Sequence, residues 1–162
     1  MNKLEIISNS PEYTMKIAKS LANKLNTGDV IILNGELGMG KTKFVEGFLQ
    51  SFNLQDEISS PTFNIVNEYI SNQVKIYHFD VYRLENSDEF LEIGGEEYFE
   101  SGICLIEWGK IIEDILPKLY IEISFEKGLE ENSRILKFII HGKSINYSNI
   151  LNKLKEELIW KY

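Results

Sequence analysis

The chain has one cysteine, two histidines and no long apolar run, and each shortage excludes a class of protein. The single Cys104 rules out a disulfide framework, and its place in the apolar run 103–106 indicates an inert buried thiol. Two histidines and one cysteine are too few for a zinc cluster. No stretch approaches the roughly 18 apolar residues of a membrane span, and the first ten residues lack the apolar core of a signal peptide. We therefore expect a soluble, cytoplasmic protein without a membrane partner.

Positive charge is also scarce. The net charge is −8, and the segment 84–109 contains no Lys or Arg but eight acidic residues, namely Glu85, Asp88, Glu89, Glu92, Glu96, Glu97, Glu100 and Glu107. Such a surface repels a phosphate backbone, so tight independent binding to nucleic acid is not expected. The acidic stretch 85–100 is either a solvated helical face or a docking surface for a basic partner protein.

The most informative segment that is present is GELGMGKT, from Gly35 to Thr42, which satisfies G-x-x-x-x-G-K-[ST] in full. The apolar run 30–33 before it predicts a buried strand, and the helical spacing of apolar residues from Phe44 to Phe52 predicts a helix after it. Strand, loop and helix in this order form the context of a phosphate-binding P-loop. Lys41 would reach the β- and γ-phosphates, and the Thr42 hydroxyl would be a Mg²⁺ ligand. We predict a site for ATP or GTP, and the absence of an N-K-x-D segment favours ATP.

The remaining pattern alternates between helical and strand periodicity. With 162 residues and 43% apolar content, this favours a single α/β domain over 1–162, a three-layer α/β/α P-loop NTPase-like fold with a mixed central sheet. Helices are predicted from Pro11 to Leu25, from Phe44 to between Ser51 and Leu54, and at 87–92, 95–100, 110–116 and 148–160. Strands are predicted at 30–33, 62–70, 74–79, 103–107, 119–125 and 134–141, with 62–70 and 74–79 forming a hairpin.

Two of these strands end in a carboxylate. The apolar run 76–79 is followed by Asp80, and the run 103–106 by Glu107. Ligands collect at the carboxyl edge of an open α/β sheet, and hydrolysis or transfer of a phosphoryl group needs an acid there to hold Mg²⁺ or orient the attacking oxygen. Either residue alone fits an ordinary strand-terminal acid. Beside a P-loop, however, we expect at least one of them to act with Lys41 in catalysis.

Four blocks in this order resemble the bacterial TsaE proteins, formerly YjeE, which are small P-loop ATPases needed for the threonylcarbamoyl modification of adenosine 37 in tRNA. The blocks are GELGMGKT at 35–42, SPTF at 60–63 with VNEY at 66–69, YHFDVYRL at 77–84 and LIEW at 105–108. The first is generic, whereas HFDVYRL and IEW together are highly specific. The resemblance covers nearly the whole chain and implies an accessory ATPase that acts on the proteins TsaD and TsaB, and on tRNA only through them.

The resemblance also implies roles for individual residues. It makes Thr42 and Glu107 the Mg²⁺ ligands and Asp80 a carboxylate required for hydrolysis. Thr62 lies in a switch-like loop that could sense the γ-phosphate, and Glu12 and Arg134 fall near the nucleotide base. Lys43 stands where many relatives have a second threonine. The predicted nucleotide-contacting residues are Glu12, Gly35, Gly38, Met39, Gly40, Lys41, Thr42, Lys43, Thr62 and Arg134.

Two other functions remain open at this point, a small-molecule P-loop kinase and a nucleotide-sensing module without turnover. Such kinases usually stabilise the transferring phosphoryl group with several arginines, and this chain has only Arg83 and Arg134. The same shortage predicts slow hydrolysis by the isolated protein. Among nearby residues, His78 is expected to be a satisfied structural histidine rather than a catalytic one, and Trp108 either steadies its turn or has a role in positioning the site or meeting a partner.

Overall fold

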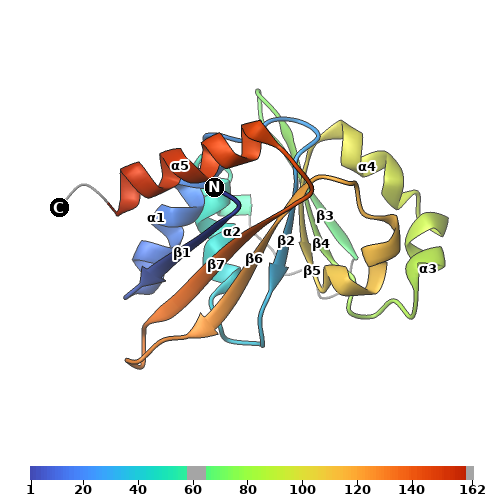
Figure 1. Cartoon of the computed structure of the whole chain (residues 1–162). Helices are drawn as coiled ribbons and strands as arrows, with labels where there is room; N and C mark the ends of the chain where they lie inside the picture. Colours follow the sequence, from blue (N-terminus) through green and yellow to red (C-terminus); the bar gives the residue numbers. More distant parts are fainter. Residues whose placement is uncertain (58–64, 160–162) are drawn as a thin grey trace.

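The computed structural model describes residues 1–57 and 65–159, and its centre is a seven-stranded sheet with helices on both faces (Figure 1). The strand order is β1-β7-β6-β2-β5-β4-β3. Strands β6, β2, β5 and β4 are parallel to one another, and the remaining pairs are antiparallel. The strands are β1 (Lys3–Ser8), β2 (Val30–Asn34), β3 (Val66–Ile70), β4 (Lys75–Asp80), β5 (Ile103–Glu107), β6 (Tyr120–Lys127) and β7 (Arg134–His141). The helices are α1 (Pro11–Ala22), α2 (Lys41–Gln50), α3 (Ser87–Glu92), α4 (Gly95–Ser101) and α5 (Ile145–Leu158), with 3₁₀ segments η1 (Gln55–Glu57) and η2 (Gly109–Ile115).

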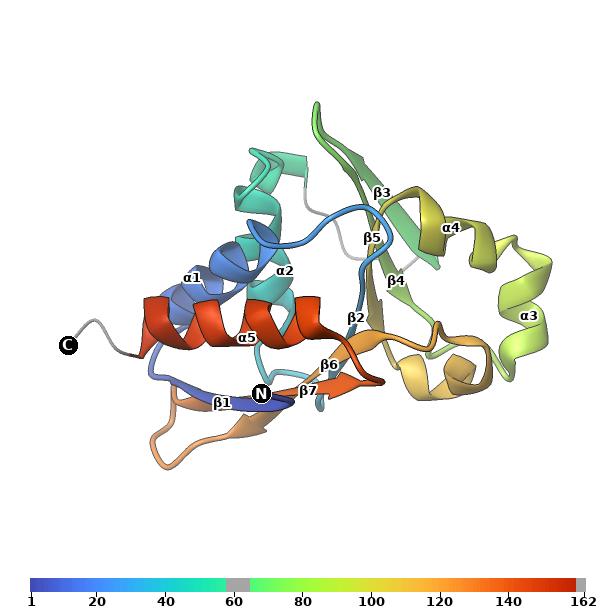
Figure 2. The ribbon, with the colours of Figure 1, turned by 45° about the horizontal axis from the view of Figure 1, so that its top comes forward.

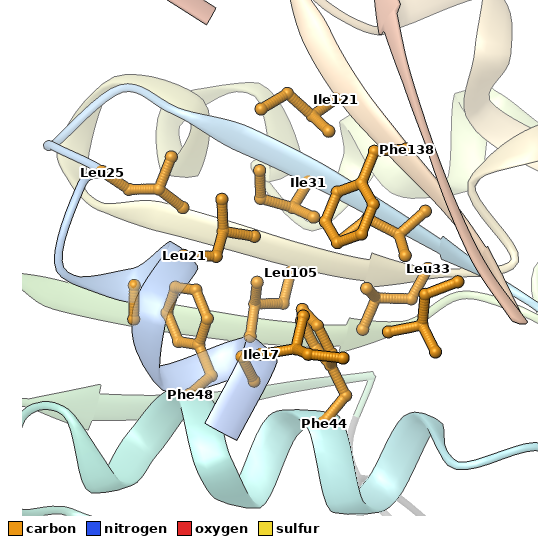
Figure 3. Close-up of a cluster of buried hydrophobic side chains, with 14 of the residues drawn as sticks. Ile17, Leu21, Leu25, Ile31, Leu33, Phe44, Phe48, Leu105, Ile121 and Phe138 are labelled. Carbon is orange, nitrogen blue, oxygen red and sulfur yellow. The ribbon is translucent and has the colours of Figure 1, made fainter. Parts of the chain in front are cut away.

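Successive residues of the central strands face opposite layers of the molecule. Ile31 and Leu33 of β2 belong to a core formed with α1, α2 and α5, in which Phe44 of α2 is fully buried (Figure 3). Val30 and Ile32 belong to a second core on the side of α3, α4 and η2. Figures 1 and 2 show these two groups of helices on opposite sides of the sheet. The three-layer α/β/α architecture with a mixed sheet is therefore confirmed.

The strand, the loop and the helix of the glycine-rich segment lie where the sequence predicts, and the hairpin of β3 and β4 is also present. Its turn is closed by the Ser71 amide, which donates to the Val74 carbonyl. The predicted strand 62–70 is described only from Val66 on, because 58–64 lie outside the described residues. The segment predicted as helix 110–116 is the 3₁₀ segment η2, which is interrupted by non-helical backbone at Ile112.

Two helix ends and one strand show where the structure differs from the prediction. Helix α1 ends at Ala22, because the amides of Lys24 and Leu25 bond to carbonyls three residues back and tighten the last turn. Helix α5 begins at Ile145, three residues early, since the Ser144 side chain caps it. Strand β1 was not predicted at all. Its alternation of exposed and buried residues over Lys3–Ser8 completes the sheet beside β7.

A buried cysteine, acidic helices and the lack of a long apolar helix were expected from the composition. Cys104 is fully buried, and burial raises the pKa of its thiol to about 12, as an inert structural cysteine requires. Most of the acidic side chains on α3 and α4 are exposed to solvent. Within 1–57 and 65–159, no helix is both long and apolar enough to span a bilayer.

Candidate functional site

The glycine-rich loop joins the carboxyl end of β2 to the first residue of α2. Gly38 has φ of 86°, and Gly40, which precedes the helix, has φ of 105°. Side chains disfavour these values, so the loop conformation depends on glycine at both positions. Gly40 has no side chain to cap the amides of the first turn, which leaves the positive end of α2 suited to an anion. Gly35 and Met39 complete the loop, and Met39 packs on the core below it.

Lys41, the first residue of α2, is held against the carboxyl edge of the sheet. Its side chain is only 8% exposed, and its Nζ lies 3.5 Å from Oε1 of Glu107. The same ammonium is 5.4 Å from the ring centroid of Trp108, which adds a cation–π contact. Thr42, next along the first turn, is exposed. Lys43 points away from this group and pairs with Glu46 on the exposed side of α2.

The two predicted strand-terminal acids lie side by side. Asp80 and Glu107 are register partners on the parallel strands β4 and β5. The Val81 amide donates to the Glu107 carbonyl, and Oδ1 of Asp80 accepts a hydrogen bond from the Tyr82 amide at 3.2 Å. The structure thus brings Lys41, Asp80 and Glu107 together at one edge of the sheet, as predicted.

The two carboxyl groups have opposite pKa shifts. Burial acts to raise the pKa of Glu107, but the hydrogen bond and charge of His78 and the ammonium of Lys41 outweigh it, so the pKa is lowered. For Asp80, burial raises the pKa and the neighbouring Glu107 adds to the rise, which the hydrogen bond from the Tyr82 amide only partly offsets. Its partners therefore favour the ionised form of Glu107, whereas burial makes the Asp80 carboxylate a stronger base than an exposed aspartate.

His78 is the site residue that sequence reasoning underestimated. Its Nε2 lies 2.7 Å from Oε2 of Glu107, and its side chain is 6% exposed. The available signal was strand periodicity, because residues two apart share a face and His78 is two residues before Asp80. The expectation of a structural histidine did not include this hydrogen bond to a predicted site carboxylate.

The remaining predicted residues differ in how close they lie to the glycine-rich loop. Arg134 lies beside the loop, where its Nη2 donates to the Gly38 carbonyl at 3.4 Å. Glu12 is in the exposed first turn of α1, and the structure shows no contact between it and the loop among the described residues. Thr62 lies outside the described residues. Arg83 stacks on the Tyr82 ring and donates to its hydroxyl, and within the described ranges it forms no ion pair with the acidic run.

A cleft of about 310 Å³ opens beside Lys41. It is lined by Leu33, Asn34, Gly35, Glu36, Lys41, Trp108 and Lys110. A larger hollow of about 400 Å³ lies next to it over η2 and β6, and the two share Asn34 and Lys110. None of Lys41, Asp80 and Glu107 lines the larger hollow. The smaller cleft is lined by Lys41 and is therefore the one next to the predicted site.

Across the described ranges, no three His, Cys, Asp or Glu side chains are grouped so that they could hold a metal ion. Mg²⁺ does not need such a cage, since it is usually bound by one or two protein oxygens together with phosphate and water oxygens. The ionised Glu107 beside Lys41 and the hydroxyl of Thr42 in the adjacent turn are hard oxygen donors of this kind. The donor set therefore fits Mg²⁺ bound with a nucleotide.

Comparisons with known proteins agree on one family. The family model described as threonylcarbamoyl adenosine biosynthesis protein TsaE matches residues 8–136. A relative from Rickettsia felis, named tRNA threonylcarbamoyladenosine biosynthesis protein TsaE, is 38% identical over 147 residues, covering 90% of this chain and 85% of the relative. The protein of the same name from Bacillus subtilis is 38% identical over 136 residues, covering 83% and 85%. The crystal structure of Bacillus subtilis YdiB matches with a TM-score of 0.78 and 33% identity, over 96% of this chain and 95% of that one.

Proposed function

The chain belongs to the TsaE family of threonylcarbamoyl adenosine biosynthesis proteins, and from this membership we propose that it is a Mg²⁺-dependent ATPase of that pathway. It binds ATP at the glycine-rich loop and hydrolyses it slowly in the cytoplasm. It acts as an accessory subunit of TsaD and TsaB and reaches tRNA only through them. It is not itself the transferase of the threonylcarbamoyl group.

The observation that carries this proposal is the meeting of three charged side chains from three elements. Lys41 begins α2, Asp80 ends β4 and Glu107 ends β5, and all three lie at the carboxyl edge of the sheet beside the loop. A nucleotide-binding module without turnover would need only the loop and its lysine. The pair of carboxylates with pKa values shifted in opposite directions favours hydrolysis.

Each residue has a distinct task in the proposed reaction. Lys41 and the first-turn amides of α2 bind the β- and γ-phosphates, and Arg134 holds the loop tip through the Gly38 carbonyl. Thr42 and Glu107 would hold Mg²⁺, which supplies positive charge against the phosphate oxygens when bound. Asp80 orients the attacking water and accepts its proton, a role that its raised pKa suits.

The shortage of arginine explains why partner proteins are part of the proposal. Arg134 donates to the Glu131 and Ser133 carbonyls between β6 and β7 and to the Gly38 carbonyl of the glycine-rich loop, and Arg83 is engaged with Tyr82. Neither is placed to stabilise the charge that develops on the γ-phosphoryl group, a task that an arginine supplied by another protein performs in many related NTPases. We expect turnover by the isolated chain well below the tens per second of efficient phosphoryl-transfer enzymes, and a change in that rate when TsaD and TsaB bind.

Thin-layer chromatography of γ-labelled ATP tests the proposal. We expect release of inorganic phosphate that needs Mg²⁺, loss of nucleotide binding in Lys41→Ala, and loss of turnover with retained binding in Glu107→Ala. Lys43→Ala is the matched control, since the side chain of this neighbouring lysine is exposed and pairs with Glu46, and the substitution keeps the backbone amide of Lys43 for the predicted nucleotide contact. Transfer of label to a small acceptor would instead indicate a kinase, and unchanged ATP affinity in Lys41→Ala would contradict the assignment of the loop.

A further inference from the structure

We propose that His78 is a positioning residue that fixes the orientation of the Glu107 carboxylate and thereby selects which of its oxygens is free to bind the metal. His78 holds Oε2, and Oε1 is left to face Lys41 and the cation. This inference rests on the proposed Mg²⁺-ATPase function, and it assigns to a residue outside the predicted site a measurable share of metal affinity.

The two oxygens of Glu107 have unequal partners. Oε2 is 2.7 Å from Nε2 of His78, the distance of a short charge-assisted hydrogen bond, whereas Oε1 is 3.5 Å from Nζ of Lys41, beyond strong hydrogen-bonding range. An ionised carboxylate only accepts hydrogen bonds, so Nε2 carries the hydrogen. The histidine is therefore the firmer of the two contacts.

The ring of His78 is well placed to serve as an anchor. Strand β4 lies inside the sheet between β3 and β5, and His78 is paired in register with the fully buried Leu105. Its side chain is 6% exposed, so the ring has little room to turn. Nδ1 is buried and has no hydrogen-bond partner in the part of the chain that the structure describes. A histidine kept for structural reasons normally uses both nitrogens, and this one directs its single hydrogen bond at Glu107.

Nucleotide binding makes the difference between the two contacts important. A triphosphate would draw Lys41 toward its own oxygens, and the Lys41 contact of Glu107 would be lost. The hydrogen bond from His78 involves no group that binds phosphate, so it persists through that exchange. Glu107 would then keep one fixed orientation while Oε1 passes from lysine to metal. Groups that orient metal ligands in this way typically contribute about 10- to 100-fold to metal affinity.

The test compares His78→Gln, His78→Asn and His78→Leu. The amide nitrogen of Gln reaches the position of Nε2 and can donate to Glu107, whereas the amide of Asn is shorter and reaches only the position of Nδ1. His141→Leu is the matched control, because His141 also contacts a carboxylate, Glu122, at 3.2 Å, but is 37% exposed and lies on β7, which β6 and β2 separate from β5 and β4. Mn²⁺, as a paramagnetic substitute for Mg²⁺, is titrated by electron paramagnetic resonance with each variant saturated with ADP.

We expect His78→Leu and His78→Asn to weaken Mn²⁺ binding about tenfold or more, and His78→Gln and His141→Leu to stay within about threefold of the parent. ADP affinity measured by calorimetry in EDTA should be unchanged in all four, which a general loss of structure would not produce. Nitrogen NMR of the parent protein should show a hydrogen of His78 on Nε2, a readout that needs no variant to fold.

Three results would overturn the inference. One is Mn²⁺ affinity in folded His78→Leu within twofold of the parent. Another is equal loss in the Gln and Asn variants, and the third is a His78 tautomer with its hydrogen on Nδ1. If the parent itself bound neither ADP nor Mn²⁺, the proposed function would fail together with this inference. If the parent binds and hydrolyses normally while the variants match it, only the role of His78 is refuted.

Discussion

Glu107→Gln should destabilise the folded protein even when nothing is bound to it. The substitution keeps the size of the side chain and the possibility of a hydrogen bond with His78, but it removes the negative charge that Lys41 faces. Lys41 is 8% exposed and Glu107 14% exposed, so the remaining ammonium would be buried without an anion at 3.5 Å. The same glutamate that we assign to metal binding thus also contributes to stability.

The magnitude follows from burial and distance. Breaking a fully buried ion pair by removing one partner costs about 3–5 kcal/mol. Because this pair is 3.5 Å apart and partly exposed, we expect a smaller loss of unfolding free energy, about 2 kcal/mol. For a chain of this size, that corresponds to a fall in melting temperature of roughly 4–8 °C. Glu46→Gln provides the control, because Glu46 pairs with Lys43 of the same helix at the shorter distance of 3.1 Å, but with side chains 30% and 50% exposed. We expect a change of about 0.5 kcal/mol or less in the control.

The dependence on pH gives a second check of the same reasoning. The pKa of Glu107 is lowered in the folded state, so its ionisation stabilises the fold at pH values above the unfolded pKa of about 4.3. That contribution is lost as the pH falls through the lower, folded-state pKa. Urea unfolding of parent and Glu107→Gln at pH 7 and at several values below 4 should show the difference shrinking with acidity. A larger effect in Glu46→Gln than in Glu107→Gln, or a difference that does not change with pH, would refute the argument from burial.

Three further predictions concern single positions. Asp80→Asn should abolish hydrolysis but raise the melting temperature at pH 7, because a raised pKa means that the ionised carboxylate disfavours folding; the gain should vanish as the pH falls below the unfolded pKa of about 3.9. Cys104 should not react with Ellman's reagent at pH 8 in the native protein and should react fully in denaturant, since burial raises its pKa to about 12. Gly40→Ala and Gly28→Ala should each cost about 1–2 kcal/mol in urea unfolding, because their φ angles are 105° and 100°, but only Gly40→Ala should weaken ATP binding in calorimetry.

An element could be predicted from the sequence where its local residue pattern agrees with its place in the folded protein. Residues 30–33 are all apolar because β2 is covered on both faces there, and the glycines with positive φ reflect a backbone conformation that other residues disfavour. Asp80 and Glu107 were found because the carboxyl ends of parallel strands meet at one edge. Order along the chain therefore carried most of the information about the predicted site.

Strand β1 and the hydrogen bond of His78 were not predicted, because both depend on pairing between strands that are distant in the sequence. Strand β1 is six residues long and is stabilised by its register with β7, more than 120 residues away, so its weak alternation alone did not identify it. The hydrogen bond between His78 and Glu107 likewise requires β4 to lie beside β5, in the register that pairs His78 with Leu105. Neither residue type nor spacing reveals that contact until the strand order is known.

In the proposed function, the contact between Lys41 and Glu107 would link phosphate binding to metal binding. A phosphate that takes Lys41 leaves Oε1 of the buried Glu107 facing negative charge, which is unfavourable until a divalent cation lies between them. A cation that binds Oε1 alone would instead lie against the ammonium of Lys41. Phosphate binding therefore removes the unfavourable contact that the cation would meet, and the cation removes the one that phosphate would create. Thermodynamic linkage requires that each ligand raises the affinity for the other by the same factor. On the proposed function, the same ion pair that stabilises the fold would make nucleotide and metal prefer to bind together, and His78 would keep the carboxylate in place for both.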